Sequence, residues 1–218
     1  MVLLICALAV AANLLTILLF SNLMIPLFWD TLFTVAVAFA LGLFPGIAVA
    51  VLTWAMNAIF LPYGSFHPFV FVSIAEVFLV CLLKPLAFEE QSWTRNPTIP
   101  ERKATYVAIV SAQLFVLYIV CAVAASVIGG SIAFLYYMVW DRGIPSFFIA
   151  VNAFRWNFLQ GGSPVLLADI LPRIQINIVG RFMSIFGGYF ISLIIKQAVK
   201  VFLSKTISPD GTRRVPGP

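Results

Sequence analysis

Residues 169–200 read DILPRIQINIVGRFMSIFGGYFISLIIKQAVK, and this stretch decides the fold. Four polar residues recur in it at intervals of four, close to one helical turn, so they lie near one face of a helix. They are Asp169, Arg173, Asn177 and Arg181. Almost everything around them is apolar. We therefore predict a membrane-spanning helix with a polar stripe at its start.

The two arginines are the best lead to function, because an arginine in a membrane helix must face protein, a wet cavity or lipid headgroups. Snorkelling at the interface explains Arg173 as well as burial does. Arg181 lies about 12 Å deeper along the helix. We expect Arg181 to be buried, either in a structural role or facing a substrate.

The composition points to an integral membrane protein. The chain is 62% hydrophobic and 10% charged, whereas soluble domains carry about 25% charged residues. Its 218 residues leave room for about five to seven spans of roughly 20 residues. We predict one all-α membrane domain over residues 1–203 and a polar cytoplasmic tail over 204–218, with no room for a soluble catalytic domain.

Six apolar segments are predicted to span the membrane, at residues 1–20, 31–44, 47–61, 69–83, 104–128 and 172–203. Asp30 is expected to cap the second span. Residues 43–46 are expected to form a tight turn before the third. Gly129 and Gly130 are expected to end the fifth span, and Pro172 to start the sixth.

Residues 131–168 are rich in aromatics but broken by charges and glycines, with no clean run of 18 apolar residues. Such a segment is a weak span candidate. We predict an aromatic cap on the outer face, between the fifth and sixth spans, that is interfacial or re-entrant.

The basic residues predict the orientation. With six spans, one side carries Lys84, Arg95, Arg102, Lys103, Lys196, Lys200, Lys205, Arg213 and Arg214, and the other side carries Arg142, Arg155, Arg173 and Arg181. The positive-inside rule places the richer side in the cytoplasm. Both termini are then cytoplasmic.

Glu76 falls in the middle of the fourth span, where a carboxylate must be protonated, paired or turned to a cavity. Arg181 is its candidate partner. Arg173, Asn177 and Arg181 suit an anionic or carbonyl-bearing ligand, and nearby aromatic rings suit stacking on a flat ring. The predicted substrate site is Asp30, Glu76, Tyr136, Trp140, Arg155, Trp156, Arg173, Asn177 and Arg181.

Several other classes of function are disfavoured. His67 is the single histidine, with no cysteine or second histidine near it, so a metal site is not expected. The chain has no P-loop, GxSxG or HExxH motif, so we expect neither an enzyme nor a cofactor. The net charge of +5 comes from helix ends and loops and reports orientation rather than nucleic-acid binding.

The order of motifs resembles the S components of energy-coupling factor (ECF) transporters, the substrate-binding subunits of prokaryotic vitamin importers. The likeness rests on a first helix with small residues, on Asp30-Thr31, on Gly42-Leu-Phe-Pro-Gly46, and on the spacing of Pro172, Asn177 and Arg181 in the last helix. It covers roughly residues 1–203.

The resemblance implies six helices, an outward-facing site for a vitamin-like micronutrient, and separate coupling and ATPase subunits. It also implies that Ala7 and Ala11 dock to the membrane coupling subunit. This chain has Gly180 where the family often has an acidic residue before its arginine. Two alternatives stay open: a membrane-embedded ligand-sensing domain of a signalling protein, and a structural membrane subunit that binds no ligand.

Overall fold

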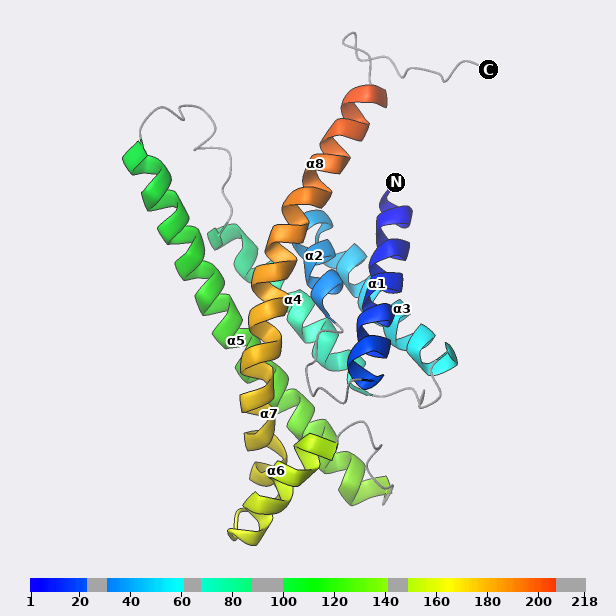
Figure 1. The fold of residues 1–218 in the computed structure, drawn as a ribbon, viewed down its shortest axis with the longest axis vertical. Helices are drawn as coiled ribbons and strands as arrows, with labels where there is room; N and C mark the ends of the chain where they lie inside the picture. Colours follow the sequence, from blue (N-terminus) through cyan, green and yellow to red (C-terminus); the bar gives the residue numbers. More distant parts are fainter. Residues whose placement is uncertain (23–30, 61–67, 88–99, 141–148, 207–218) are drawn as a thin grey trace.

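The computed structural model describes residues 1–22, 31–60, 68–87, 100–140 and 149–206, and the regular structure within them is helical. The helices are α1 (Val2–Asn22), α2 (Leu32–Leu41), α3 (Leu43–Phe60), α4 (Val70–Ala87), α5 (Pro100–Trp140), α6 (Ile149–Gln160), α7 (Val165–Phe182) and α8 (Gly188–Thr206). A π-helical segment, Met183–Gly187, continues α7 into α8 without a break (Figure 1).

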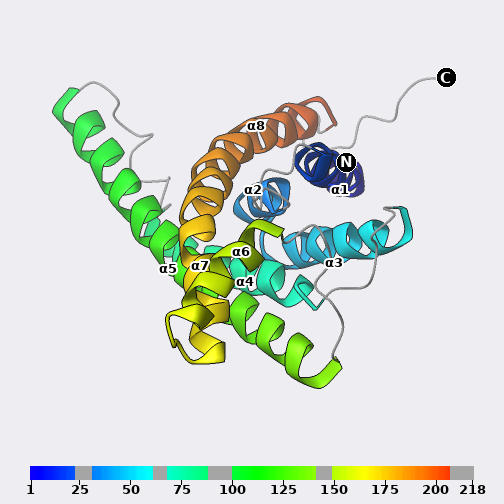
Figure 2. The ribbon, with the colours of Figure 1, turned by 60° about the horizontal axis from the view of Figure 1, so that its bottom comes forward.

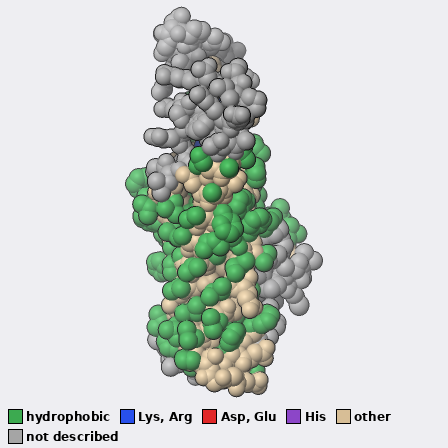
Figure 3. Space-filling view, turned by 90° about the vertical axis from the view of Figure 1, so that its left-hand side faces the viewer, with side chains coloured by type: hydrophobic (Ala, Val, Ile, Leu, Met, Phe, Trp, Pro, Cys, Tyr) green, Lys and Arg blue, Asp and Glu red, His purple; other side chains and the backbone are tan. Residues whose placement is uncertain are grey.

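Four stretches are long and apolar enough to cross a membrane: Val2–Leu19, Leu43–Phe60, Val107–Leu135 and Val165–Ser204. Leu32–Leu41 and Val70–Leu83 are shorter apolar helices. Apolar side chains are spread over the described surface on the side of the molecule where α5 lies, and charged side chains are almost absent from it (Figure 3). The chain is a multi-pass, all-α membrane protein, as its composition predicted, while the number of spans stays a prediction.

Helix α2 is the centre of the bundle, and it packs against α1, α3, α4 and α8 (Figures 1 and 2). All six residues from Thr34 to Phe39 are buried, as expected of a helix that is apolar on every side. It has ten residues, so it is about 15 Å long, half the thickness of a bilayer core. Its N-cap residue Thr31 is buried, so the first backbone N–H groups of α2 need protein partners.

Helices α5 and α7 cross at very close range, and Gly130 makes this possible. A Cβ atom added at Gly130 would lie 2.5 Å from Ile170 Cγ1 and 2.9 Å from Ile170 Cα. This crossing also lies beside Asp169, whose carbonyl oxygen would be 3.1 Å from the added atom.

The predicted end of the fifth span was wrong. Helix α5 runs through Gly129 and Gly130 to Trp140, because Gly130 lies at the close crossing with α7 rather than in a turn. The predicted cap over 131–168 is divided accordingly. Its first part belongs to α5 and its last part begins α7, and α6 is a separate helix among the described residues between them.

Three predicted helix boundaries were also wrong. Helix α7 begins at Val165, with Pro172 inside it; a proline within a membrane helix is tolerated where neighbouring groups compensate for the lost hydrogen bond. The break between α2 and α3 is the single residue Gly42, with φ +96°, and Pro45 lies in the first turn of α3, where no helical N–H is needed. The N-cap of α2 is Thr31, not Asp30, which lies outside the described residues.

Candidate functional site

The polar stripe of α7 faces the protein interior along its whole length. Asp169, Arg173, Asn177 and Arg181 are all at least 95% buried. The interfacial explanation of Arg173 is therefore wrong, because its side chain packs inside the bundle rather than reaching water. From Asp169 to Arg181 the stripe runs about 18 Å along the helix.

Arg181 is held in a central cluster, which we define as Thr31, Glu76, Arg181 and Ser184. Its Nη1 lies 2.7 Å from Glu76 Oε2, which confirms the predicted pair between α7 and α4. The same nitrogen donates to Thr31 Oγ1, and the hydroxyls of Thr31 and Ser184 are 3.3 Å apart. Arg181 thus ties together α2, α4 and α7.

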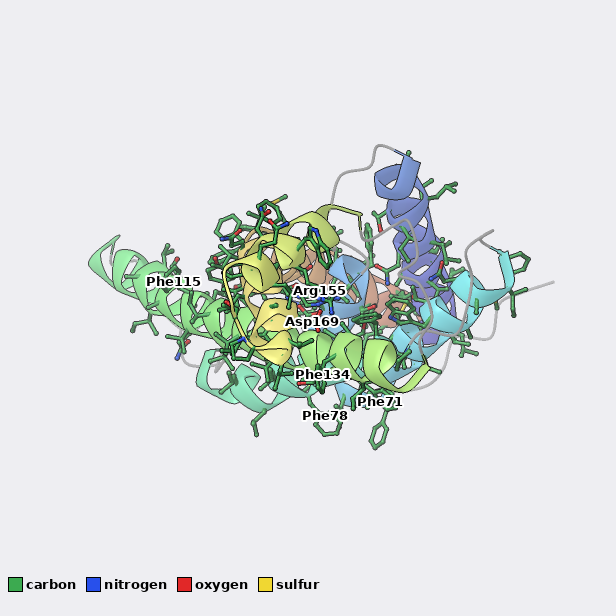
Figure 4. The ribbon with its side chains drawn as sticks, turned by 90° about the horizontal axis from the view of Figure 1, so that it is seen from below. Phe71, Phe78, Phe115, Phe134, Arg155 and Asp169 are labelled. Carbon is green, nitrogen blue, oxygen red and sulfur yellow. The ribbon has the colours of Figure 1, made fainter. Side chains whose placement is uncertain are left out.

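At the other end of the stripe lies the α6 cluster: Arg155, Asp169 and Arg173. Arg155 of α6 donates through Nε to Asp169 Oδ1 at 2.6 Å, and Figure 4 shows the two side chains together near the middle of that end. Arg173 lies over the Phe69 ring, 5.2 Å from its centroid, a cation–π arrangement. By contrast, the labelled Phe71 and Phe78 point away from the bundle (Figure 4).

Asn177 lies between the two clusters and links α7 to α5. Its Nδ2 donates to Ser126 Oγ at 3.0 Å, and the Ser126 hydroxyl donates to the Ala122 carbonyl oxygen at 2.7 Å. The stripe is therefore a column of hydrogen-bonding groups shared between helices.

Asp169 Oδ2 and Arg181 Nε are buried in this column and make no hydrogen bond in the described structure. A buried polar atom without a partner costs about 1–3 kcal/mol, and more when it is charged. A ligand acceptor near Arg181 would satisfy its Nε, and a ligand donor near Asp169 would satisfy its Oδ2.

The other predicted site residues lie elsewhere or cannot be placed. Trp156 follows Arg155 on α6, and its side chain is 60% exposed. Tyr136 and Trp140 belong to the last turns of α5, but their side chains lie outside the described part, as does Asp30. Ala7 and Ala11 are both exposed on α1, and their docking role stays a prediction.

Sequence reasoning missed Thr31 and Ser184 as partners of Arg181. Threonine and serine are frequent in membrane helices, so neither residue stands out by type. The available signal was the spacing, since Ser184 follows Arg181 by three positions and so shares its face of the helix.

Comparisons with protein-family models, with curated proteins and with solved structures found no match for this chain. The length and apolar character of its helices make it a multi-pass membrane protein.

Proposed function

We propose that the chain is the substrate-capturing subunit of an ECF-type importer of a vitamin-like micronutrient. The observation that carries the proposal is the buried column on α7. It has charged groups at both ends, and its buried atoms Asp169 Oδ2 and Arg181 Nε make no hydrogen bond in the described structure. Ionisable groups at membrane depth are costly, and they commonly mark substrate pathways.

The ligand enters from the end of the bundle where α6 lies, which we assign to the outer face. The charge of the column favours an anionic or carbonyl-bearing ligand, because the described clusters hold three guanidinium groups and two carboxylates. Arg173 is the first arginine that such a ligand meets beyond the Arg155–Asp169 pair. Charge-assisted hydrogen bonds to guanidinium groups are strong and directional.

The ECF assignment itself comes from the sequence resemblance. In that arrangement separate ATPase subunits supply the energy, and a membrane coupling subunit docks against α1 at Ala7 and Ala11. The exposure of both alanines in the isolated chain is compatible with such a surface. The protein lies in the cytoplasmic membrane with both termini in the cytoplasm.

A structural subunit without a ligand is the competing function, and the Glu76–Arg181 pair favours it. On that hypothesis the two residues neutralise one another and bind nothing further. The two functions differ in one observable, which is the presence of a bound small molecule.

The test is native mass spectrometry of gently extracted protein, with identification of the released molecules. We expect one water-soluble ligand per chain in the wild type. We expect it to be lost in Arg173→Gln and kept in Gln175→Ala, an exposed position on the same helix. Lipid alone in the wild type, after extraction in several mild detergents, would overturn the capture function. Equal retention in Arg173→Gln would overturn the assignment of the site.

A further inference from the structure

A second group of buried polar side chains lies between α1, α2 and α3, around Asn13. Asn13 is fully buried. Its Nδ2 donates to Thr34 Oγ1 at 2.9 Å and to Thr53 Oγ1 at 3.3 Å. Its Oδ1 accepts from the backbone N–H of Phe33 at 3.2 Å. A side chain of α1 therefore caps the buried N-terminus of α2 from outside that helix.

The same group continues through α3 and α4 toward Arg181. Trp54 follows Thr53 on α3, and its Nε1 donates to Ser73 Oγ at 3.1 Å. Ser73 and Glu76 are one turn apart on α4, and Glu76 pairs with Arg181.

The path then closes through hydrogen bonds between helices and through neighbouring positions on the same helix. Arg181 donates to Thr31, which is one turn from Thr34 on α2. We call this closed path the polar ring, and it consists of Asn13, Thr31, Thr34, Thr53, Trp54, Ser73, Glu76 and Arg181. All eight side chains are buried, and they come from α1, α3 and α4, from α7, and from α2 with its N-cap.

We propose that the polar ring couples the hydrogen bonding of the Arg181 guanidinium to the position of α1. Asn13 is the positioning residue that α1 contributes. The proposal rests on the proposed function only in taking a ligand as what changes the state of Arg181. In an apolar interior, a broken hydrogen bond leaves a buried polar group without a partner, which is costly. The neighbouring side chains of the ring therefore shift together and keep their hydrogen bonds.

The direction of the effect follows from the geometry. A ligand acceptor at Arg181 competes with Glu76 and Thr31 for the guanidinium. Thr31 is the N-cap of α2, and the next turn of that helix is held by Asn13. A shift there moves α1, whose opposite side exposes Ala7 and Ala11.

The experiment uses the full chain in nanodiscs without any ligand. Trp54 is the reporter, because it lies in the ring midway between Asn13 and Arg181. The chain has five tryptophans, so ¹⁵N labelling of the indoles gives at most five N–H signals, and Trp54→Phe assigns the relevant one. The substitutions are Arg181→Gln and Asn13→Leu, with Ser126→Ala as the matched control, since Ser126 is buried and hydrogen-bonded but outside the ring.

We expect both ring substitutions to move the Trp54 signal and the control to leave it in place. If Asn13→Leu does not fold, Thr34→Val removes the hydrogen bond between Asn13 and Thr34 with little change of shape. A second measurement is thermal unfolding. The loss of Tm in Asn13→Leu/Arg181→Gln should be smaller than the sum of the single losses, whereas Asn13→Leu/Ser126→Ala should be additive.

The proposal would be overturned if the Trp54 signal stayed in place in Arg181→Gln, or in Asn13→Leu (or Thr34→Val). It would also be overturned if Ser126→Ala moved the signal equally. Additive losses of Tm for Asn13 and Arg181 would overturn it as well. Neither outcome depends on a bound ligand, so the capture function would still be judged by mass spectrometry alone.

Discussion

Arg181 and Glu76 show how a membrane protein holds two charges at depth. Each side chain is at most 4% exposed, and their closest atoms are 2.7 Å apart. Removing either partner leaves the other as an uncompensated buried charge, which is far more costly than the absence of both. The stability of this site therefore depends on the pair more than on either residue.

Single neutralisations should consequently cost more than the double one. We expect Glu76→Gln and Arg181→Gln each to lower the free energy of unfolding by about 3 kcal/mol. The double variant Glu76→Gln/Arg181→Gln should lose less than either, because no charge is left unpaired. Denaturation in a fixed detergent measures all three, and a double variant that loses the sum of the single effects would show that the two side chains do not interact.

At this scale the sequence predicted much of the column but little of its surroundings. The four-residue spacing was enough to place Asp169, Arg173, Asn177 and Arg181 on one buried face, and the cost of an isolated Glu76 pointed to its partner. Thr31 as a partner of Arg181 and the role of Asn13 could not be predicted, because both depend on which helices are neighbours.

At the scale of elements, the contrast between Gly129 and Gly130 shows how crossing distance is set. A Cβ at Gly129 would meet its nearest neighbour, Phe69, at 3.7 Å, an ordinary contact, whereas at Gly130 it would meet the backbone of α7. Gly130 therefore allows the close approach of α7, whereas Gly129 makes room for no such contact.

Alanine substitutions at the two glycines should have opposite effects on stability. We expect Gly129→Ala to be neutral or to stabilise by up to about 1 kcal/mol, since alanine is the better helix former. Gly130→Ala should destabilise by about 1–3 kcal/mol through overpacking against Ile170. Thermal unfolding of the two variants is the measurement, and equal effects would mean that α5 and α7 do not cross at Gly130.

The same glycines explain why the helix boundaries were predicted poorly. A Gly-Gly pair commonly marks a turn, and only the position of a neighbouring helix distinguishes a turn from a close crossing. The predicted start at Pro172 was wrong for a similar reason. Proline is acceptable in the first turn of a helix, and also inside a membrane helix where neighbouring groups replace the lost backbone hydrogen bond.

At the scale of the whole molecule, composition decided the class correctly, while the arrangement had to come from the structure. The short α2 is the clearest case, since ten apolar residues do not reveal that a helix stands in the centre of a bundle. Figure 1 also places the start of α1, the start of α5 and the end of α8 toward one end of the molecule, and α6 toward the other.

This arrangement makes the predicted orientation testable with one residue at each end. Gln160 at the end of α6 and Ser204 near the end of α8 are both exposed. The native Cys6 and Cys121 are buried and Cys81 is partly buried, so the unmodified chain gives the labelling background. In intact cells, a membrane-impermeant maleimide should label Gln160→Cys and not Ser204→Cys, which should react only after permeabilisation. This expectation rests on the basic residues of the polar tail and of residues 84–103, which favour the cytoplasm. The reverse labelling pattern would mean that this charge bias does not set the orientation. The α6 end of the column on α7 would then face the cytoplasm.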